Sequence, residues 1–168
     1  MPPSTACAES NSRTRTLVIC LGNEHRGDDA FGPRVARCLG STLEPAARVV
    51  AHRGDELALI ELWRDQDRVI LVDAIAIDRP PGTILHFDVS HGAAPLELGG
   101  ASTHALGAGG AIEIARALGQ LPGKFEIIAV AGSRFDLGAP LTPEVASGVD
   151  VVVGQLRSAI AGAIGPDS

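Results

Sequence analysis

The segment LVICLGNEHRGDDAFG (residues 17–32) changes from an apolar run to a densely charged loop within a few positions. Residues 16–21 form an apolar run of strand length, which is typical of a strand buried on both faces of a sheet. The loop that follows carries Glu24 and the adjacent acids Asp28 and Asp29. Because an ordinary surface turn needs only one or two polar residues, this loop is a candidate for chemistry at the end of a strand.

Strands and helices alternate along the rest of the chain. Apolar runs predict strands, and apolar stripes at helical spacing next to capping residues predict helices. The predicted strands are residues 16–21, 47–52, 68–76, 83–89 and 124–132, and the predicted helices are residues 30–40, 55–64, about 103–118, and 143 to the end. This alternation is typical of an α/β sheet with helices on both faces. The short turn at residues 80–82 predicts an antiparallel strand after it, since a parallel return needs a longer crossover.

The composition limits the possible classes of protein. The chain has 168 residues, of which 45% are apolar, so one domain with one core is expected. Its net charge of −6 argues against nucleic-acid binding, because neutralising phosphates requires clustered Lys and Arg. No apolar run approaches the ~20 residues of a membrane-spanning helix. Residues 1–15 are polar and are expected to form a disordered tail before a single domain at residues 16–168.

The three cysteines, Cys7, Cys20 and Cys38, have unrelated spacing and include no CxxC pair. They indicate neither a disulfide framework nor a thiolate zinc site, and a reducing cytoplasm is the expected location. Cys20 and Cys38 lie in apolar runs, so both are expected to be inert thiols in the core.

Candidate functional residues follow two of the predicted strands and open one helix. In an open α/β sheet, ligands bind beyond the carboxyl ends of the strands. Asp28 and Asp29 come after the first strand, and Asp73 lies near the end of the third. His104 begins the helix after a glycine-rich loop. This layout allows the four side chains to meet at one edge of the sheet.

Each of these residues also has a structural explanation. One acid can cap a helix, but two adjacent acids repel, so the second needs a partner such as a cation. Burying the carboxylate of Asp73 is costly without a partner, although a hydrogen bond to a neighbouring loop would explain it. A lone histidine such as His104 is usually a surface or core residue. The glycines after it (Gly107, Gly109 and Gly110) weaken a helix and indicate close approach of the backbone to another group.

Two carboxylates and an imidazole form a ligand set that suits a divalent metal with open positions, such as zinc, nickel or manganese. An open position permits Lewis-acid chemistry or an activated water. His25 and His52 are candidates to line the same cleft. Other chemistries lack their motifs: the sequence has no GxSxG, HExxH, GxGxxG dinucleotide fingerprint or GK[ST] phosphate loop.

Several short motifs occur in an ordered set along residues 16–162. They are GlyAsn (22–23), AspAsp (28–29) and Gly32 after the first strand, ValAspAla (72–74), ProGlyThr (81–83), SerThrHis (102–104) followed by LeuGly (106–107), and LeuThrPro (141–143). This set resembles the hydrogenase maturation endopeptidases. Those enzymes trim the C-terminal extension of the large subunit of nickel–iron hydrogenases.

The resemblance implies a fold, a site and a partner. The fold is a three-layer α/β/α sandwich around a five-stranded, mostly parallel sheet with one antiparallel strand. Asp29, Asp73 and His104 are the implied metal-contacting and catalytic positions, with Asp28 as the flanking acid. The partner is the immature large subunit, and the metal is the nickel already inserted in it, although another divalent metal could bind in vitro. An O/O/N set without a thiolate suits docking onto a metal that another protein presents. We expect a monomer that meets this substrate transiently.

The chain departs from the usual family pattern at Ala30, where Gly is frequent, and at HisArgGly (52–54) with Asp55, where AspGlyGlyThr is frequent. The second loop is expected to shape the substrate groove. Two other functions stay open. One is a non-catalytic recognition module on the same fold that binds a metal centre or a chaperone. The other is a nucleotide or sugar-phosphate enzyme that uses the loop at residues 22–27, which is disfavoured because neighbouring acids repel phosphate.

Overall fold

The computed structural model describes residues 15–93 and 103–162, and it shows the predicted α/β architecture. Its elements are β1 (Thr16–Leu21), the short 3₁₀ turn η1 (Gly27–Ala30), α1 (Phe31–Leu39), β2 (Ala47–His52), α2 (Glu56–Trp63), β3 (Arg68–Ala76), β4 (Ile84–Asp88), α3 (Thr103–Ala117), β5 (Lys124–Gly132) and α4 (Pro143–Gly162). Of the predicted disordered tail at residues 1–15, residues 1–14 lie outside the described residues, and the backbone N–H of Arg15 donates to Asp67 at 2.7 Å.

The five strands form one sheet in the order β2-β1-β3-β5-β4. Four strands are parallel, and β4 runs antiparallel to β5. The antiparallel direction of this strand was predicted from the short turn before it, but its partner is β5 and not the preceding strand β3. The chain therefore skips one position in the sheet, and β5 later fills the gap between β3 and β4.

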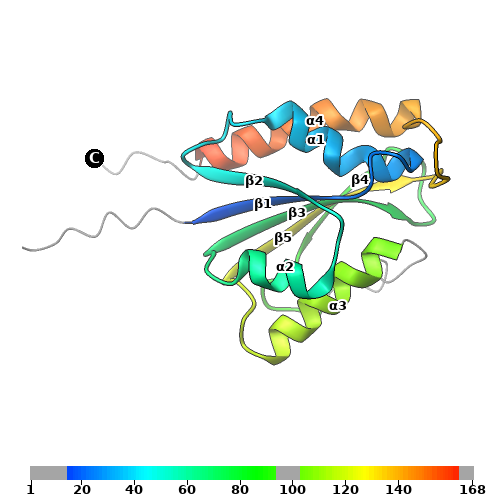
Figure 1. Ribbon diagram of the computed structural model, residues 1–168. Coiled ribbons are helices and arrows are strands. Elements are labelled where there is room, and N and C mark those ends of the chain that lie inside the picture. The colour runs from blue at the N-terminus through cyan, green and yellow to red at the C-terminus, as the bar shows by residue number, and fades with distance from the viewer. Residues whose placement is uncertain (1–14, 94–102, 163–168) are drawn as a thin grey trace, which may run out of the picture.

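Helices cover both faces of the sheet and complete the three layers (Figure 1). One face packs against α2 and α3, and its core contains Leu71, Ile75 and the fully buried Trp63. The other face packs against α1 and α4, and its core contains Val72 and Phe31. Successive residues of β3 belong to opposite cores, because side chains alternate between the faces of a strand. This double burial explains why the central strands read as continuous apolar runs.

The predicted core thiols differ from one another in the structure. Cys20 is buried in β1, as expected. Cys38 is exposed, which corrects the prediction for this residue. It lies on α1 next to the buried Leu39, and a helix turns by about 100° per residue, so neighbouring positions face different ways.

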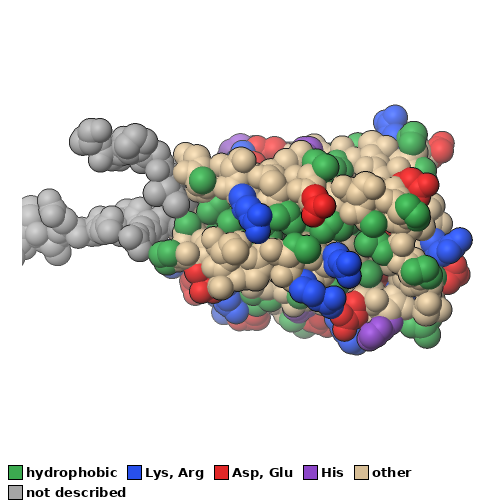
Figure 2. Space-filling model, turned by 90° about the horizontal axis from the view of Figure 1, so that it is seen from above, with side chains coloured by type: hydrophobic (Ala, Val, Ile, Leu, Met, Phe, Trp, Pro, Cys, Tyr) green, Lys and Arg blue, Asp and Glu red, His purple; other side chains and the backbone are tan. Residues whose placement is uncertain are grey.

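Charged side chains are interspersed on the face formed by α1 and α4 (Figure 2). Acidic and basic groups lie among apolar and uncharged atoms, and Lys and Arg form no continuous patch in this view. On this face, the interspersed charges offer no continuous basic surface for a phosphate backbone. Within residues 15–93 and 103–162, no helix has the length and apolar character needed to cross a membrane.

Candidate active site at the carboxyl end of the sheet

The carboxyl end of β3 extends beyond the end of β1. The last pair between these strands joins Cys20 to Val72, so Asp73 is the first residue of β3 without a β1 neighbour. The chain from β1 turns here into η1, which carries Asp28 and Asp29 and contacts β3. The structure thus brings both acidic segments predicted from the sequence to the same end of the sheet.

All three acids are buried at this end of the sheet. The exposed fraction is 0% for Asp28 and 2% for both Asp29 and Asp73. Such burial of an ionised carboxylate is costly unless hydrogen bonds or opposite charges compensate. The contacts of each acid therefore decide which of them is structural and which is available for chemistry.

Asp28 is held by a dense set of hydrogen bonds from the loop between β5 and α4. Its Oδ2 accepts from the backbone N–H groups of Ser133 (2.8 Å) and Arg134 (3.0 Å). Its Oδ1 accepts from the backbone N–H (2.8 Å) and the hydroxyl (2.7 Å) of Thr142. Burial raises the pKa of this carboxyl, but the hydrogen bonds outweigh burial, and the pKa lies below its usual range. Asp28 is thus a structural anion, which explains one of the two adjacent acids.

Asp29 turns toward the loop that leaves β1. Its Oδ2 accepts a hydrogen bond from the backbone N–H of Asn23 at 3.1 Å. The backbone of Asp29 lies against Gly22, where an added Cβ would come within 1.9 Å of the Asp29 carbonyl oxygen and where φ is +134°. Only glycine fits this contact and this backbone conformation. The GlyAsn motif therefore lets the loop pass close to Asp29 and bind its carboxylate.

Asp73 shares a face of β3 with Leu71 and Ile75, both of which belong to the core beneath α2 and α3. Its Oδ1 accepts a hydrogen bond from the backbone N–H of Ala74 at 2.8 Å. The side chain therefore projects from the end of a central strand toward the layer that contains α3.

His104 lies in the first turn of α3, as the sequence predicted. Because α3 leads into the amino end of β5, its own beginning lies at the carboxyl end of the sheet (Figure 1). The side chain of His104 is outside the described part of the structure, so its place in the ligand set stays a prediction. Among the side chains that the structure describes, no three His, Cys, Asp or Glu residues form a group able to hold a metal ion.

A groove of about 660 Å³ lies beside the loop that binds Asp29. Its lining includes Asn23, whose N–H binds Asp29, and the residues His52 and Arg53 at the end of β2. His52 and Arg53 thus line a groove, and the role of their loop in substrate binding stays a prediction. Nδ1 of His52 accepts from the backbone N–H of Gly54 at 2.9 Å, which fixes the imidazole ring. His25, the other histidine expected to line the cleft, is exposed, and its Nε2 lies 3.7 Å from Oε1 of Glu24.

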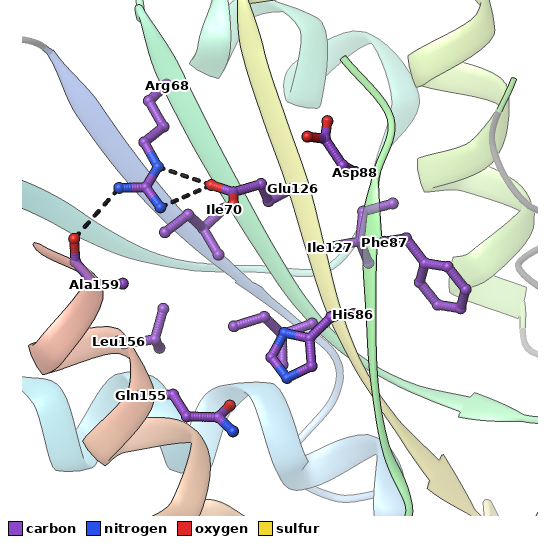
Figure 3. A pocket seen from close by; sticks show the side chains of 11 residues that line it. Arg68, Ile70, His86, Phe87, Asp88, Glu126, Ile127, Gln155, Leu156 and Ala159 are labelled. Carbon is purple, nitrogen blue, oxygen red and sulfur yellow. Dashed lines mark hydrogen bonds and ion pairs between the residues drawn. The ribbon is translucent and has the colours of Figure 1, made fainter. Parts of the chain in front are cut away.

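A second groove of about 490 Å³ lies between α4 and strands β3, β5 and β4 (Figure 3). Arg68 and Glu126 form an ion pair in its wall, and His86 and Gln155 are among its other lining residues. Arg68 begins β3, so this groove is at the amino end of the parallel strands. It is thus at the opposite end from Asp73 and is not part of the candidate site.

The loop between β5 and α4 is the part of the site that the sequence did not reveal. Thr142 precedes α4 as predicted, but its hydroxyl donates to Asp28. The only sequence signal was the pair of adjacent acids, one of which needed a partner. Nothing in the sequence identified Ser133 and Arg134 as that partner, because they are more than 100 residues away from Asp28.

Comparison with known proteins identifies the family of the chain. The family model described as hydrogenase maturation protease, HycI, matches residues 41–159, which is more than half of the chain. The match includes Asp73 and His104, whereas Asp28 and Asp29 precede it. The comparison with curated proteins found no match.

Solved structures of hydrogenase maturation proteases have a similar fold. The hydrogenase maturating endopeptidase HybD from Escherichia coli matches with a TM-score of 0.79 and 23% identity, over 89% of this chain and 94% of that one. The [NiFe] hydrogenase maturation protease HybD from Thermococcus kodakarensis matches with a TM-score of 0.69 and 27% identity, over 87% and 99%. The hydrogenase 2 maturation peptidase from Thaumarchaeota archaeon SCGC_AB-539-E09 matches with a TM-score of 0.64 and 27% identity, over 87% of this chain and 97% of that one. From the family match over most of its length, the chain belongs to the hydrogenase maturation protease family.

Proposed function

We propose that this chain is the endopeptidase that removes the C-terminal extension of an immature nickel–iron hydrogenase large subunit after nickel insertion. Family membership supports the peptidase class. The observation that carries the more specific proposal is the pair of buried carboxylates, Asp29 and Asp73, which lie on the contacting elements η1 and β3 at the carboxyl end of the sheet.

In this proposal the nickel belongs to the substrate. Asp29, Asp73 and His104 supply two oxygen ligands and one nitrogen ligand to the metal that the precursor presents. Carboxylate and imidazole ligands suit a borderline divalent metal, and the absence of a thiolate fits transient contact better than permanent storage. The peptidase thereby tests whether the large subunit is loaded before cutting it.

The carboxylates also suit the hydrolysis itself. A carboxylate within reach of a water molecule can accept its proton while the water oxygen attacks the scissile carbonyl carbon. The same acid can then return the proton to the leaving amine as the peptide C–N bond breaks. Polarisation of the carbonyl by a metal would assist this route. We assign the proton-accepting role to the pair Asp29 and Asp73 together.

The substrate tail is expected to lie in the groove of about 660 Å³. The groove leads from the end of β2 to Asn23, whose backbone holds Asp29. An extended segment in it would pass beside the carboxylate. We further propose that the protein acts in the cytoplasm as a monomer.

The proposal is tested by incubating the protein with an immature large subunit that is either nickel-loaded or nickel-free, followed by intact-mass measurement of the subunit. We expect loss of the C-terminal peptide from the loaded precursor only. Asp29→Ala and His104→Ala should abolish this loss, whereas Asp88→Asn, at the other end of the sheet, should not. Binding of the loaded precursor without any cleavage would instead support the non-catalytic recognition module. Equal cleavage of both precursors would contradict recognition of nickel.

A further inference from the structure

Two loops at the carboxyl end of the sheet are joined by a set of hydrogen bonds that we call the clasp. The first loop (22–30) follows β1, and the second loop (133–142) follows β5. Backbone bonds run from Gly27 N to Ala139 O (3.0 Å), from Asp28 N to Arg134 O (2.7 Å) and from Gly138 N to His25 O (2.7 Å). Nε of Arg26 also donates to the carbonyl oxygen of Phe135 at 3.2 Å. The second loop therefore fixes the conformation of the first.

The Asp28 carboxylate is the centre of the clasp. Its Oδ2 accepts two backbone hydrogen bonds from the beginning of the second loop, at Ser133 and Arg134. Its Oδ1 accepts two hydrogen bonds from Thr142 at the end of that loop. An ionised carboxylate is an acceptor at both oxygens, so it satisfies four donors at once. An asparagine amide would turn an N–H donor toward either Thr142 or the Ser133–Arg134 pair. The site therefore requires the acid and not merely a polar side chain.

The clasp is rigidly connected to Asp29. Both acids belong to η1, a turn of four residues, so the carboxylate of Asp28 and the backbone of Asp29 cannot move independently. On the far side of the turn, the backbone of Asp29 lies against Gly22, and the Asn23 N–H binds the Asp29 side chain. The turn is thus held between the second loop and the end of β1.

We infer that Asp28 is a positioning residue, which acts through the clasp to hold the Asp29 carboxylate in the orientation that contacts the substrate. The inference rests on the proposed function of Asp29, and it makes the loop after β5 part of the active site. The two adjacent acids thus have different roles. Asp28 binds the second loop, and Asp29 contacts the substrate.

The first test measures amide hydrogen exchange by NMR and does not depend on activity. The variant Asp28→Asn should exchange the amides of Ser133, Arg134 and Thr142 at least tenfold faster than the wild type. If Asp28 positions Asp29, the Asn23 amide should accelerate as well, while amides in the centre of β3 stay unchanged. Acceleration in the second loop with no change at Asn23 would overturn the inference.

Asp88→Asn is the matched control for this measurement. Asp88 accepts hydrogen bonds from the N–H and hydroxyl of Ser90 and from Nζ of Lys124, at the other end of the sheet. The same chemical change there should leave the exchange of Asn23 unaltered. If Asp28→Asn fails to fold, Thr142→Val is used instead, because it removes one of the four bonds and keeps the size of the side chain.

The second test measures cleavage of the nickel-loaded precursor at a temperature at which every variant is folded. Asp28→Asn should lower kcat at least tenfold, with KM changed less than threefold. Thr142→Val should show a smaller loss of kcat, and Thr142→Ser, which keeps the hydroxyl, should restore wild-type values. Wild-type kcat in folded Asp28→Asn would overturn the inference. If even the wild type does not cleave, the proposed function fails, while the exchange of Asn23 still decides whether Asp28 positions Asp29.

Discussion

Acidic side chains occupy both ends of the parallel strands, but their partners differ. At the amino end, Glu126 pairs with Arg68 at 2.8 Å and Asp88 pairs with Lys124 at 2.6 Å (Figure 3 shows the first pair). At the carboxyl end, Asp28 accepts hydrogen bonds from three backbone N–H groups and one hydroxyl. The acids of the amino end are partly exposed, whereas those of the carboxyl end are buried.

This difference distinguishes acids that pair with a positive charge from an acid that neutral donors hold. Exposed ion pairs contribute little to stability, typically about 0–1 kcal/mol, and they cancel the charge of the acid. Backbone N–H groups hold a carboxylate in place but bring no full positive charge. A protein that must present a negative group to a cation can therefore use amides to orient it without neutralising it.

The largest expected effect is on cleavage. Asp73→Asn should reduce the rate of precursor cleavage by at least about 100-fold, which is the range for loss of a general acid–base group. The measurement is single-turnover cleavage of the nickel-loaded precursor. The matched change at the amino end, Asp88→Asn, should leave the rate within about twofold. Comparable losses of cleavage rate in Asp73→Asn and Asp88→Asn would contradict a catalytic role confined to the carboxyl end of the sheet.

The second largest effect is on folding. Asp28→Ala leaves three backbone N–H groups without their acceptor, and each unsatisfied buried donor costs about 1–3 kcal/mol. Partial access of water to the loop should reduce the sum, so we expect the free energy of unfolding to fall by about 2–4 kcal/mol. Urea denaturation followed by circular dichroism measures it. A loss no larger than that of Asp88→Ala would show that the clasp adds nothing to stability.

The third effect is on local opening near the carboxyl end. Burial raises the pKa of the Cys20 thiol to about 12, so at neutral pH this group is protonated and protected from alkylation. In a chain with Cys7→Ser and Cys38→Ser, labelling by iodoacetamide should be slow. Asp28→Ala should accelerate it, and Asp88→Asn should not. Fast labelling of Cys20 in the chain with an intact clasp would contradict a tightly packed β1.

The smallest effect concerns pH and the amino end. Hydrogen bonds from Lys124 and Ser90 hold the pKa of Asp88 well below its usual range. A lowered pKa in the folded state contributes stability above the pKa of the unfolded chain, about 3.9, and this stability is lost as the pH falls through the folded value. The stability difference between wild type and Asp88→Asn should therefore shrink as the pH falls below about 4. Thermal melts between pH 2 and pH 6 would show it, and a constant difference would contradict it.

Much of the fold was predictable because short sequence patterns identify the individual strands and helices. The predicted strands 68–76 and 124–132 coincide with β3 and β5, since each is a continuous apolar run bounded by polar or turn residues. Asp55 caps α2 by accepting from the N–H of Ala58 at 2.9 Å, and aspartate is among the residues preferred at this position. In contrast, the pairing of β4 with β5 depends on a strand that comes later in the chain, and no local pattern encodes it.

The candidate site was predicted only in part. The burial of Asp73 followed from its position inside an apolar run, and the proximity of η1 to β3 followed from the rule that strand ends share one edge. The separate roles of Asp28 and Asp29 could not be predicted, because both are the same residue type at adjacent positions. Only the return of residues 133–142 to the first loop distinguishes them.

The most direct test of the proposed metal-contacting site is a crystal structure of the protein soaked in a divalent metal with an anomalous signal, such as nickel or zinc. We expect one bound ion at the carboxyl end of the sheet, with oxygens of Asp29 and Asp73 and a ring nitrogen of His104 about 2.0–2.2 Å away. Asp88 and Glu126 at the amino end should bind none. An ion bound elsewhere, or a His104 ring too distant to share a ligand sphere with the two carboxylates, would contradict the proposed site.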